Sequence, residues 1–216
     1  MPTGFIFDLD GVIVDTAKYH FKAWQSLAKS LQYNFTEQDN EQFKGVSRVR
    51  SLELLLEMAQ YKATEREKEQ WLIDKNTHYL ALISHMNNSE ILPGITEILK
   101  VLKAQQIPVA LGSASKNAKP ILEKVGLLSY FDVLVDGNEV TMAKPNPEVF
   151  LTAAKGLEVA PEDCVVFEDA QAGVAAAKAA KMTCVGIGDP AILFNADHCF
   201  ASTAEITPSF VQSLIA

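Results

Sequence analysis

The sequence predicts an α/β fold, in which a Rossmann-like parallel sheet forms the core and an all-helical cap domain is inserted after the first strand. A short apolar run at residues 4–7 stops at acidic residues, which is typical of the end of a buried strand. From residue 15 to about 88 the apolar residues recur at helical spacing, without a strand candidate. Beyond Pro93-Gly94, short apolar runs alternate with helical patterns, which indicates a parallel sheet covered by helices.

The inserted section is predicted to contain a series of helices. The second helix spans residues 36 to about 43, and the third passes through residues 52–59. Thr64 and Glu67 have the spacing of a capping box, which opens the fourth helix. The first helix begins at Thr16, and its apolar stripe contains Ala17, Phe21, Trp24, Leu27, Ala28 and Leu31.

The remainder of the chain supplies alternating strands and helices. Because the first strand lies before the helical section, we expect a discontinuous core domain over residues 1–14 and 89–216, and a cap domain over residues 15–88. In the core, we predict strands over residues 4–7, 108–112, 133–135, 164–167 and 183–187, and helices over residues 95–105, 117–125, 147–155 and 170–180.

Composition excludes several classes of function. The formal net charge of −8 disfavours nucleic-acid binding, which needs a basic face, and an anionic substrate would need a local cluster of Lys and Arg. No apolar run approaches the ~20 residues that span a bilayer, and the first residues do not resemble a signal peptide. The three cysteines are scattered without metal or disulfide spacing, and Cys164 and Cys184 open apolar runs as buried thiols do. We expect a monomeric cytoplasmic protein without a nucleic-acid or membrane partner.

Polar and acidic residues follow several of the predicted strands. Asp8-Leu9-Asp10 follows the first strand, residues 113–117 follow the strand at 108–112, and Glu168-Asp169 follow the strand at 164–167, while Lys144-Pro145 lies in a loop. Each segment alone has an ordinary structural explanation as a turn, a helix cap or a surface loop. Because the carboxyl ends of parallel strands meet at one edge of a sheet, their conjunction indicates an active site.

The chemistry that suits these residues is phosphoryl transfer. A carboxylate has a reference pKa near ~3.9, so Asp8 is ionised at neutral pH and needs no base to act as a nucleophile. Its repulsion from an anionic phosphate is relieved by a hard divalent cation, and Mg²⁺ suits carboxylates together with substrate phosphate. We expect Asp8 and Asp169, with Glu168, to hold Mg²⁺.

Three further residues have expected roles in that reaction. Ser113 and Lys144 are predicted to stabilise the equatorial oxygens of the transferring group. Asp10, two residues beyond the nucleophile, is the candidate general acid–base for the leaving or attacking hydroxyl.

The segment Phe7-Asp8-Leu9-Asp10-Gly11-Val12 resembles the opening motif of the haloacid dehalogenase superfamily. Ser113, Lys144 and Glu168-Asp169 match the other motifs of that superfamily in order, and the resemblance covers nearly the whole chain. It implies Mg²⁺ ligation by Asp8, the backbone carbonyl of Asp10, Glu168 and Asp169. It also implies phosphoryl transfer rather than dehalogenation, because true dehalogenases lack the aspartate at the position of Asp10.

Within that superfamily, the chain is most similar to the sugar-phosphate mutases. The similarity lies in residues 15–24, in residues 44–48 with Ser51, in Lys75-Asn76 and in residues 113–117. It implies that Thr16 and His20 lie beside the hinge and Asp10. Arg48, Ser115, Lys116 and Asn117 would then hold the distal phosphate of a phosphosugar, and the full implied substrate-binding set is Trp24, Lys44, Gly45, Val46, Ser47, Arg48, Ser51, Lys75, Asn76, Ala114, Ser115, Lys116 and Asn117.

The resemblance implies an isomerase that interconverts β-glucose 1-phosphate and glucose 6-phosphate through a bisphosphate. The alternatives are a sugar-phosphate phosphatase with the same nucleophile and a catalytically inactive binding domain. Without the resemblance, His20 is interpreted as a structural histidine, and Trp24 fits core packing as well as sugar contact. The segment 186–191 formally fits a dinucleotide-binding fingerprint, but Pro190 and the short remaining chain leave no room for the βαβ unit that such a site needs.

Overall fold

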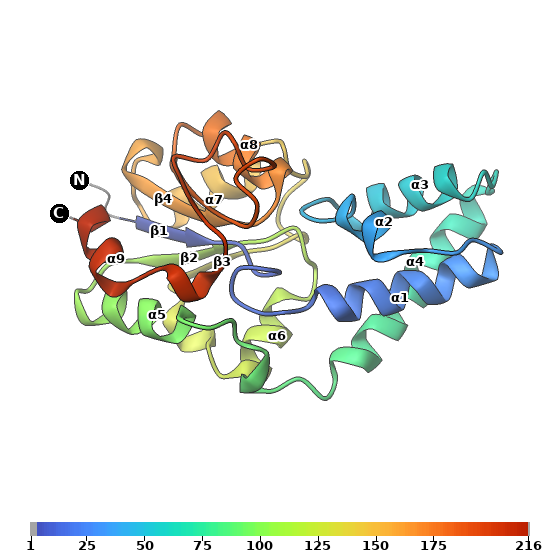
Figure 1. The fold of residues 1–216 in the computed structure, drawn as a ribbon, viewed down its shortest axis with the longest axis horizontal. Helices are drawn as coiled ribbons and strands as arrows, with labels where there is room; N and C mark the ends of the chain where they lie inside the picture. The colour runs from blue at the N-terminus through green and yellow to red at the C-terminus, as the bar shows by residue number, and fades with distance from the viewer. Residues whose placement is uncertain (1–3, 216) are drawn as a thin grey trace.

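The computed structural model describes residues 4–215, which form a sheet-based core with a helical cap beside it (Figure 1). The expected outer limits of the core domain, at residues 1–3 and 216, lie outside the described residues, as does most of the segment tested for a signal peptide. No helix in the described range combines the length and the apolarity needed to cross a membrane.

The sheet has the strand order β3-β2-β1-β4-β5-β6, and all pairs are parallel, as the sequence predicts for its core. β6 was not predicted, because three residues are too few to show alternation and its first residue is exposed. The strands are β1 (Gly4–Phe7), β2 (Val109–Gly112), β3 (Val133–Val135), β4 (Cys164–Glu168), β5 (Thr183–Ile187) and β6 (His198–Phe200).

Alternate side chains of the sheet enter two apolar layers. Phe5 and Phe7 of β1 pack with α5 (Ile95–Ala104), α6 (Ala118–Val125) and α9 (Pro208–Ile215), whereas Ile6 packs with α7 (Glu148–Gly156) and α8 (Gln171–Ala179). Figure 1 shows these two groups of helices on opposite sides of the sheet. Cys164 and Cys184 are buried free thiols, as expected.

The observed helices lie within a few residues of the predicted ones. The φ of +76° at Gly126 ends α6, since glycine tolerates the left-handed conformation there. The helix α9 was missed, although Pro208 at its first position is a usual start signal. Short 3₁₀ turns complete the core and its connections at Asn88–Glu90, Leu128–Tyr130, Pro161–Asp163 and Thr203–Glu205.

The cap consists of α1 (Ala17–Ser30), α2 (Glu37–Glu41), α3 (Arg48–Met58) and α4 (Glu65–Ile83). The predicted capping box forms, because the Thr64 hydroxyl accepts from the Glu67 amide while the Glu67 carboxylate accepts from the Thr64 amide. α2 ends earlier than predicted, since the amides after Glu41 bond three residues back, as in a 3₁₀ turn. The cap has its own apolar cluster, formed by Trp24, Leu27, Ala28, Phe35, Phe43, Leu52, Leu55 and Leu56.

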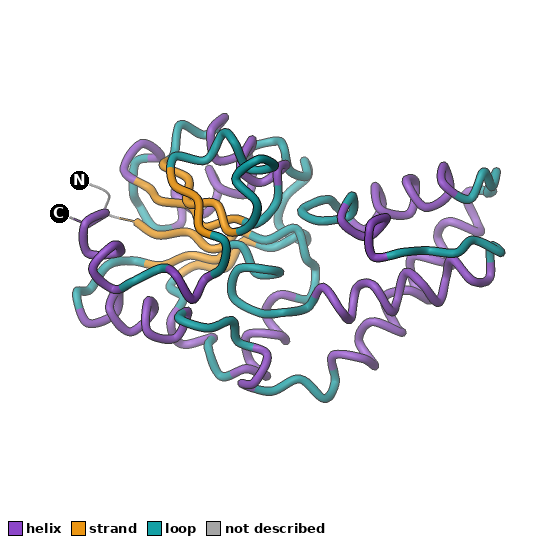
Figure 2. Tube along the Cα trace, in the orientation of Figure 1, coloured by secondary structure: helices purple, strands orange, loops and turns teal. Residues whose placement is uncertain are grey.

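The two connections between core and cap are bonded to each other. The Leu92 amide donates to the Ile13 carbonyl at 3.0 Å, and the Asp15 amide donates to the Glu90 carbonyl at 2.9 Å. The Glu90 carboxylate accepts from the Tyr19 hydroxyl at 2.8 Å. These bonds tie the start of α1 to the connection that follows α4, and Figure 2 shows loops gathered where the strands face the cap.

Candidate active site

The main cleft lies between the carboxyl ends of the strands and the cap, and its cavity has a volume of about 1360 Å³. It is lined from both sides. The core contributes the strand-end residues Asp8, Asp10, Lys144 and Asp169 together with residues 113–117, and the cap contributes, among others, His20, Trp24, Lys44, Gly45, Val46, Ser47, Arg48, Ser51 and Lys75.

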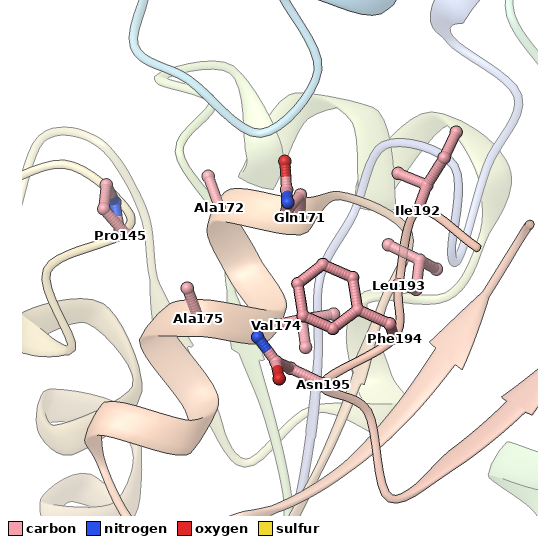
Figure 3. A pocket seen from close by; sticks show the side chains of 9 residues that line it. All are labelled: Pro145, Gln171, Ala172, Val174, Ala175, Ile192, Leu193, Phe194 and Asn195. Carbon is pink, nitrogen blue, oxygen red and sulfur yellow. The ribbon is translucent and has the colours of Figure 1, made fainter. Parts of the chain in front are cut away.

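A smaller cavity of about 300 Å³ adjoins the cleft at the first half of α8 (Figure 3). Its lining is mainly apolar, and the described lining residues include neither a titratable side chain nor a nucleophile. The catalytic groups therefore lie in the main cleft. The residues of the smaller cavity are Pro145, Gln171, Ala172, Val174, Ala175, Ile192, Leu193, Phe194 and Asn195.

Asp8 is buried directly after β1, and both of its carboxylate oxygens are held. Oδ1 accepts from Lys144 Nζ at 2.6 Å, and Oδ2 accepts from the Asp10 amide at 3.1 Å. Lys144 Nζ also donates to Glu168 Oε1 at 2.6 Å. The parallel pairing of Phe7 with Phe167 places Asp8 beside Glu168 and so creates this arrangement.

Lys144 is a buried cation whose charge is balanced by protein carboxylates. Burial alone lowers the pKa of its ammonium, but the charges of Asp8 and Glu168 outweigh that effect and raise the pKa above its usual value. Lys144 is therefore permanently charged. Its position next to the predicted nucleophile suits stabilisation of negative charge on a transferring group.

Asp169 lies next to these groups without a cation of its own. Its burial, followed by the charges of Glu168 and Asp8, raises the pKa of Asp169 well above the usual range. Within residues 4–215 no group of three or more His, Cys, Asp or Glu side chains is arranged to hold a metal. The predicted site therefore depends on Asp8, Asp169 and the Asp10 carbonyl. Such a set of oxygen donors fits Mg²⁺, which keeps several water or phosphate ligands.

Glu168 was predicted as a metal ligand, and the structure places both of its oxygens on protein donors. Oε1 accepts from Lys144, and Oε2 accepts from the Ala170 amide at 2.7 Å. Burial raises the pKa of Glu168, against the opposing effect of Lys144. In this arrangement Glu168 orients Lys144, which in turn contacts Asp8.

Two glycines make room for these acids, and sequence reasoning missed both. A Cβ atom at Gly11 would overlap the carboxylate of Asp169, and one at Gly173 would overlap the carboxylate of Glu168. Gly173 lies in the first turn of α8, where glycine destabilises a helix by about 1 kcal/mol relative to alanine. A glycine that close behind an acidic pair is the signal that would have revealed the close approach.

The loop at residues 113–117 is organised by its own hydroxyl groups. The Ser113 hydroxyl oxygen accepts from the Ser115 amide at 3.1 Å, and the Ser115 hydroxyl oxygen accepts from the Asn117 amide at 3.2 Å. Both hydroxyl groups therefore keep their protons for donation to a ligand. Ser113 is buried near Asp8, whereas Lys116 is exposed at the mouth of the cleft.

Asp10 contacts the start of the cap. The Thr16 hydroxyl donates to Asp10 Oδ1, and His20 Nε2 lies 3.9 Å from the same oxygen. Burial, followed by the charge of Asp8, raises the pKa of Asp10 to about 6. A group with that pKa has both protonation states accessible near neutral pH, as proton transfer in both directions requires.

Lys75 is a buried residue of the cap helix α4, with its Nζ 3.0 Å from His20 Nδ1. It also lies over the rings of Trp24 and Tyr79, at 4.7 and 4.8 Å from their centroids. Burial, followed by the charge of Arg48, lowers the pKa of Lys75 to about 7. Burial and Lys75 together hold the pKa of His20 well below its usual value, so His20 is neutral.

Arg48 is the first residue of α3, and burial lowers the pKa of its guanidinium. Among residues 4–215 no ion pair includes Arg48 or Lys75. By contrast, Lys44 of the implied substrate-binding set is paired with Glu41 at 2.8 Å. The cap therefore presents two partly or fully buried cations to the cleft without a paired carboxylate.

Of three further residues in the predicted substrate-binding set, Trp24 and Ser51 line the cleft, and Asn76 does not line it within the described chain. Trp24 packs edge-on against Phe43, with the ring centroids 5.5 Å apart, and also lines the cleft, so core packing is confirmed and sugar contact stays a prediction. Ser51 donates to the Ser47 carbonyl at 3.1 Å and thereby braces the start of α3. Asn76 does not line the cleft within the described chain, and its side chain contacts Asn117 instead.

Comparison with known proteins agrees with this geometry. A profile of the haloacid dehalogenase-like hydrolases matches residues 2–181. The β-phosphoglucomutase of Bacillus subtilis is 42% identical over 204 residues, which cover 94% of this chain and 90% of that protein. A phosphorylated-carbohydrate phosphatase of Thermotoga maritima is 34% identical, covering 81% and 80%. The crystal structure of a β-phosphoglucomutase from Clostridium difficile superposes with a TM-score of 0.95 at 40% identity, covering 99% and 97% of the two chains.

Proposed function

Because the chain belongs to the haloacid dehalogenase-like hydrolase family, we propose that it is a phosphosugar mutase that interconverts β-glucose 1-phosphate and glucose 6-phosphate. The substrate follows the relatives named above, and the mechanism follows from the residues of the cleft. Residues 1–14 and 89–216 act as the catalytic core, and residues 15–88 act as a cap that opens and closes. The acidic chain takes a small phosphosugar as its partner and works as a cytoplasmic monomer.

The observation that supports this proposal best is the presence of two groups of cationic and hydroxyl side chains in one cleft, each suited to a phosphate. The first contains Asp8, Ser113 and Lys144 on the core. The second contains Arg48 on the cap, which makes no ion pair within residues 4–215, together with the hydroxyl groups of the loop at 113–117, which lines the same cleft. A sugar with a phosphate at each end, or one phosphate and one hydroxyl, satisfies both sites at once.

In the first half-reaction, an Asp8 carboxylate oxygen attacks the phosphorus at C1 of bound glucose 1,6-bisphosphate, so that glucose 6-phosphate is the departing sugar. The phosphorus–oxygen bond to the sugar breaks as the aspartyl-phosphate bond forms, and protonated Asp10 gives its proton to the departing sugar oxygen. Lys144 and the Ser113 hydroxyl stabilise the charge on the transferring oxygens. Mg²⁺, held by Asp8, Asp169 and the Asp10 carbonyl, would supply charge neutralisation at the phosphoryl oxygens.

In the second half-reaction, the 6-hydroxyl of a bound β-glucose 1-phosphate attacks the phosphorus on Asp8, which forms glucose 1,6-bisphosphate again. Ionised Asp10 takes the proton of that hydroxyl, and the bond from phosphorus to Asp8 breaks. The His20–Lys75 contact and the Thr16 hydroxyl hold Asp10 in place when the cap is closed. Closure also excludes water, which would otherwise react in place of the sugar.

The test follows glucose 6-phosphate and inorganic phosphate in the same tube. Purified protein with Mg²⁺, β-glucose 1-phosphate and a trace of glucose 1,6-bisphosphate is expected to form glucose 6-phosphate far faster than it releases phosphate. Release of phosphate at least as fast as formation of glucose 6-phosphate would replace the mutase with a sugar-phosphate phosphatase. That second candidate is favoured by the named activity of the Thermotoga maritima relative.

A further inference from the structure

One hydrogen bond joins the cap to the core at the loop of residues 113–117. Because this loop is proposed to bind a phosphate, it is called the phosphate-binding loop below. Asn117 Nδ2 donates to Asn76 Oδ1 at 3.1 Å, although the two residues are 41 positions apart. Asn76 belongs to α4 of the cap, and Asn117 immediately precedes α6 of the core. The bond therefore forms only when the cap lies close to the core.

We propose that Asn76 is a positioning residue that holds the closed cap in register with the phosphate-binding loop. The proposal deepens the proposed function and rests on it, since it concerns how the same cleft favours transfer to a sugar over transfer to water. It assigns Asn76 a role through Asn117 rather than through contact with the substrate.

The surroundings of the two side chains support that role. Asn117 is buried and lines the cleft. Asn76 is half-buried and, in the described range, lies outside the lining, although its neighbour Lys75 belongs to it. Because the amide group of Asn117 is planar, fixing one N–H bond also fixes the directions of the other N–H bond and of the carbonyl oxygen. A bound phosphate then meets a donor that is already oriented.

A second contact between cap and core, at Gly45 and Ala170, is steric and, within residues 4–215, involves no hydrogen bond to the phosphate-binding loop. A Cβ atom at Gly45 would lie 2.6 Å from Ala170 Cβ, so the cap loop rests against the core by close backbone approach. That contact is steric and does not depend on the phosphate-binding loop. The bond from the Asn117 side chain to Asn76 does depend on it, because the backbone N–H of Asn117 donates to the Ser115 hydroxyl oxygen of the same loop.

The two contacts have different consequences for the reaction. Gly45 limits how far the cap closes, and Asn76 makes the closed state sensitive to the conformation of residues 113–117. On α4, Asn76 adjoins Lys75, whose Nζ contacts His20 beside Asp10. Loss of the Asn76 bond is therefore expected to shorten the closed state and to expose phosphorylated Asp8 to water.

The experiment compares Asn76→Ala with Thr77→Ala, a matched control at the next, exposed position, whose hydroxyl bonds only within its own helix. Asn76→Ala is expected to lower kcat for sugar-phosphate transfer about three- to tenfold, the range of one neutral hydrogen bond, and to raise the share of released phosphate. Hydrolysis of p-nitrophenyl phosphate, which has no distal phosphate, is expected to stay within twofold of the parent. Thr77→Ala is expected to match the parent on both substrates.

A double-mutant cycle with Asn117→Ala separates the pair from two independent effects. If the bond carries the role, Asn76→Ala has less than a twofold effect once Asn117 is alanine. Fully additive losses, or an Asn76→Ala variant whose partition between transfer and hydrolysis equals that of Thr77→Ala, would overturn the proposal.

Small-angle X-ray scattering tests the same role without turnover. In Mg²⁺ and saturating inorganic phosphate, Asn76→Ala is expected to have a larger radius of gyration than the parent and Thr77→Ala. Equal radii would contradict a role in closure. If the parent protein shows no mutase activity but Asn76→Ala still has the larger radius of gyration, the role of Asn76 in closure stands and the proposed function is rejected.

Discussion

The two faces of the cleft treat their charged groups in opposite ways. On the core, Lys144 donates to two carboxylates, Asp8 and Glu168, at 2.6 Å each. On the cap, Arg48 and Lys75 make no ion pair with any residue of the described chain, and burial lowers the pKa of both. The buried lysine of the core is therefore paired by protein carboxylates, whereas these two cap cations are left unpaired within residues 4–215.

This difference separates chemistry from recognition. The core groups are oriented before a substrate arrives, as stabilisation of a phosphoryl transition state requires. The unpaired cap cations destabilise the empty closed cleft, because a buried cation without a partner is costly. An anionic ligand relieves that cost, so cap closure becomes favourable when a phosphate occupies the cap side of the cleft.

Removal of the predicted nucleophile on the core face is expected to have the largest effect on turnover. Asp8→Asn keeps the shape of the side chain but removes its charge, so turnover is expected to fall at least about 10³-fold, by analogy with other nucleophile substitutions. Activity is measured on both β-glucose 1-phosphate and p-nitrophenyl phosphate. Circular dichroism and thermal unfolding serve as controls for the fold. Near-parent turnover by folded Asp8→Asn would show that the core face does not perform the chemistry.

Metal removal tests the core face in a second way. Excess EDTA followed by dialysis is expected to lower activity at least about 100-fold, because Asp8 and Asp169 then repel an incoming phosphate. Added Mg²⁺ is expected to restore the activity. Calorimetric titration of the parent and of Asp169→Asn provides a readout independent of turnover, with weaker Mg²⁺ binding by the variant. Unchanged activity after exhaustive chelation would exclude Asp169 from the proposed role.

Substitution of the two buried lysines is expected to change the free energy of unfolding in opposite directions. Lys144→Met leaves Asp8 and Glu168 buried without their cation and is expected to lower the free energy of unfolding by about 3–5 kcal/mol. Lys75→Met removes a cation that burial disfavours, so the free energy of unfolding is expected to rise while sugar-phosphate turnover falls. Urea unfolding of both variants measures the two effects. The same sign for both would contradict the assignment of different roles to the two faces.

The stabilising effect of Lys75→Met has a defined pH dependence. The pKa of Lys75 is about 7 in the folded chain against an ordinary value of 10.5. Between pH 7 and pH 10.5, Lys75 is therefore protonated in the unfolded chain and largely neutral in the folded chain. The penalty from Lys75 is therefore complete below about pH 7 and declines as the pH rises toward 10. The difference in unfolding free energy between Lys75→Met and the parent should shrink over that range. A difference that grows with pH would contradict the depressed pKa of Lys75.

The sequence predicted most of the fold because its signals are local. Strand β1 is an apolar run ending at acids, and the capping box at Thr64 and Glu67 needs only residues three apart. β6 was missed because a three-residue strand has no readable period, and α9 was missed although Pro208 marks its start. The meeting of the strand-end motifs followed from one rule, that parallel strands share a carboxyl edge.

Pairwise contacts within the site could not be predicted in the same way. Nothing in the local sequence indicates that Lys144 contacts both Asp8 and Glu168. The bond between Asn76 and Asn117 depends on the position of the cap over the core, which no spacing encodes. Which cation stays unpaired is therefore a property of the folded chain, and it is the property that distinguishes the two faces.

The most direct measurement compares Arg48→Ala with the parent on two substrates, one with a distal phosphate and one without. For β-glucose 1,6-bisphosphate, kcat/KM is expected to fall about 10- to 150-fold, since hydrogen bonds to charged groups contribute roughly 1.5–3 kcal/mol. For p-nitrophenyl phosphate, kcat/KM should stay within about twofold, because the core face alone handles its single phosphate. Equal losses on the two substrates would place Arg48 outside the distal-phosphate site. They would contradict the account in which the cap binds the distal phosphate and the core performs the phosphoryl transfer.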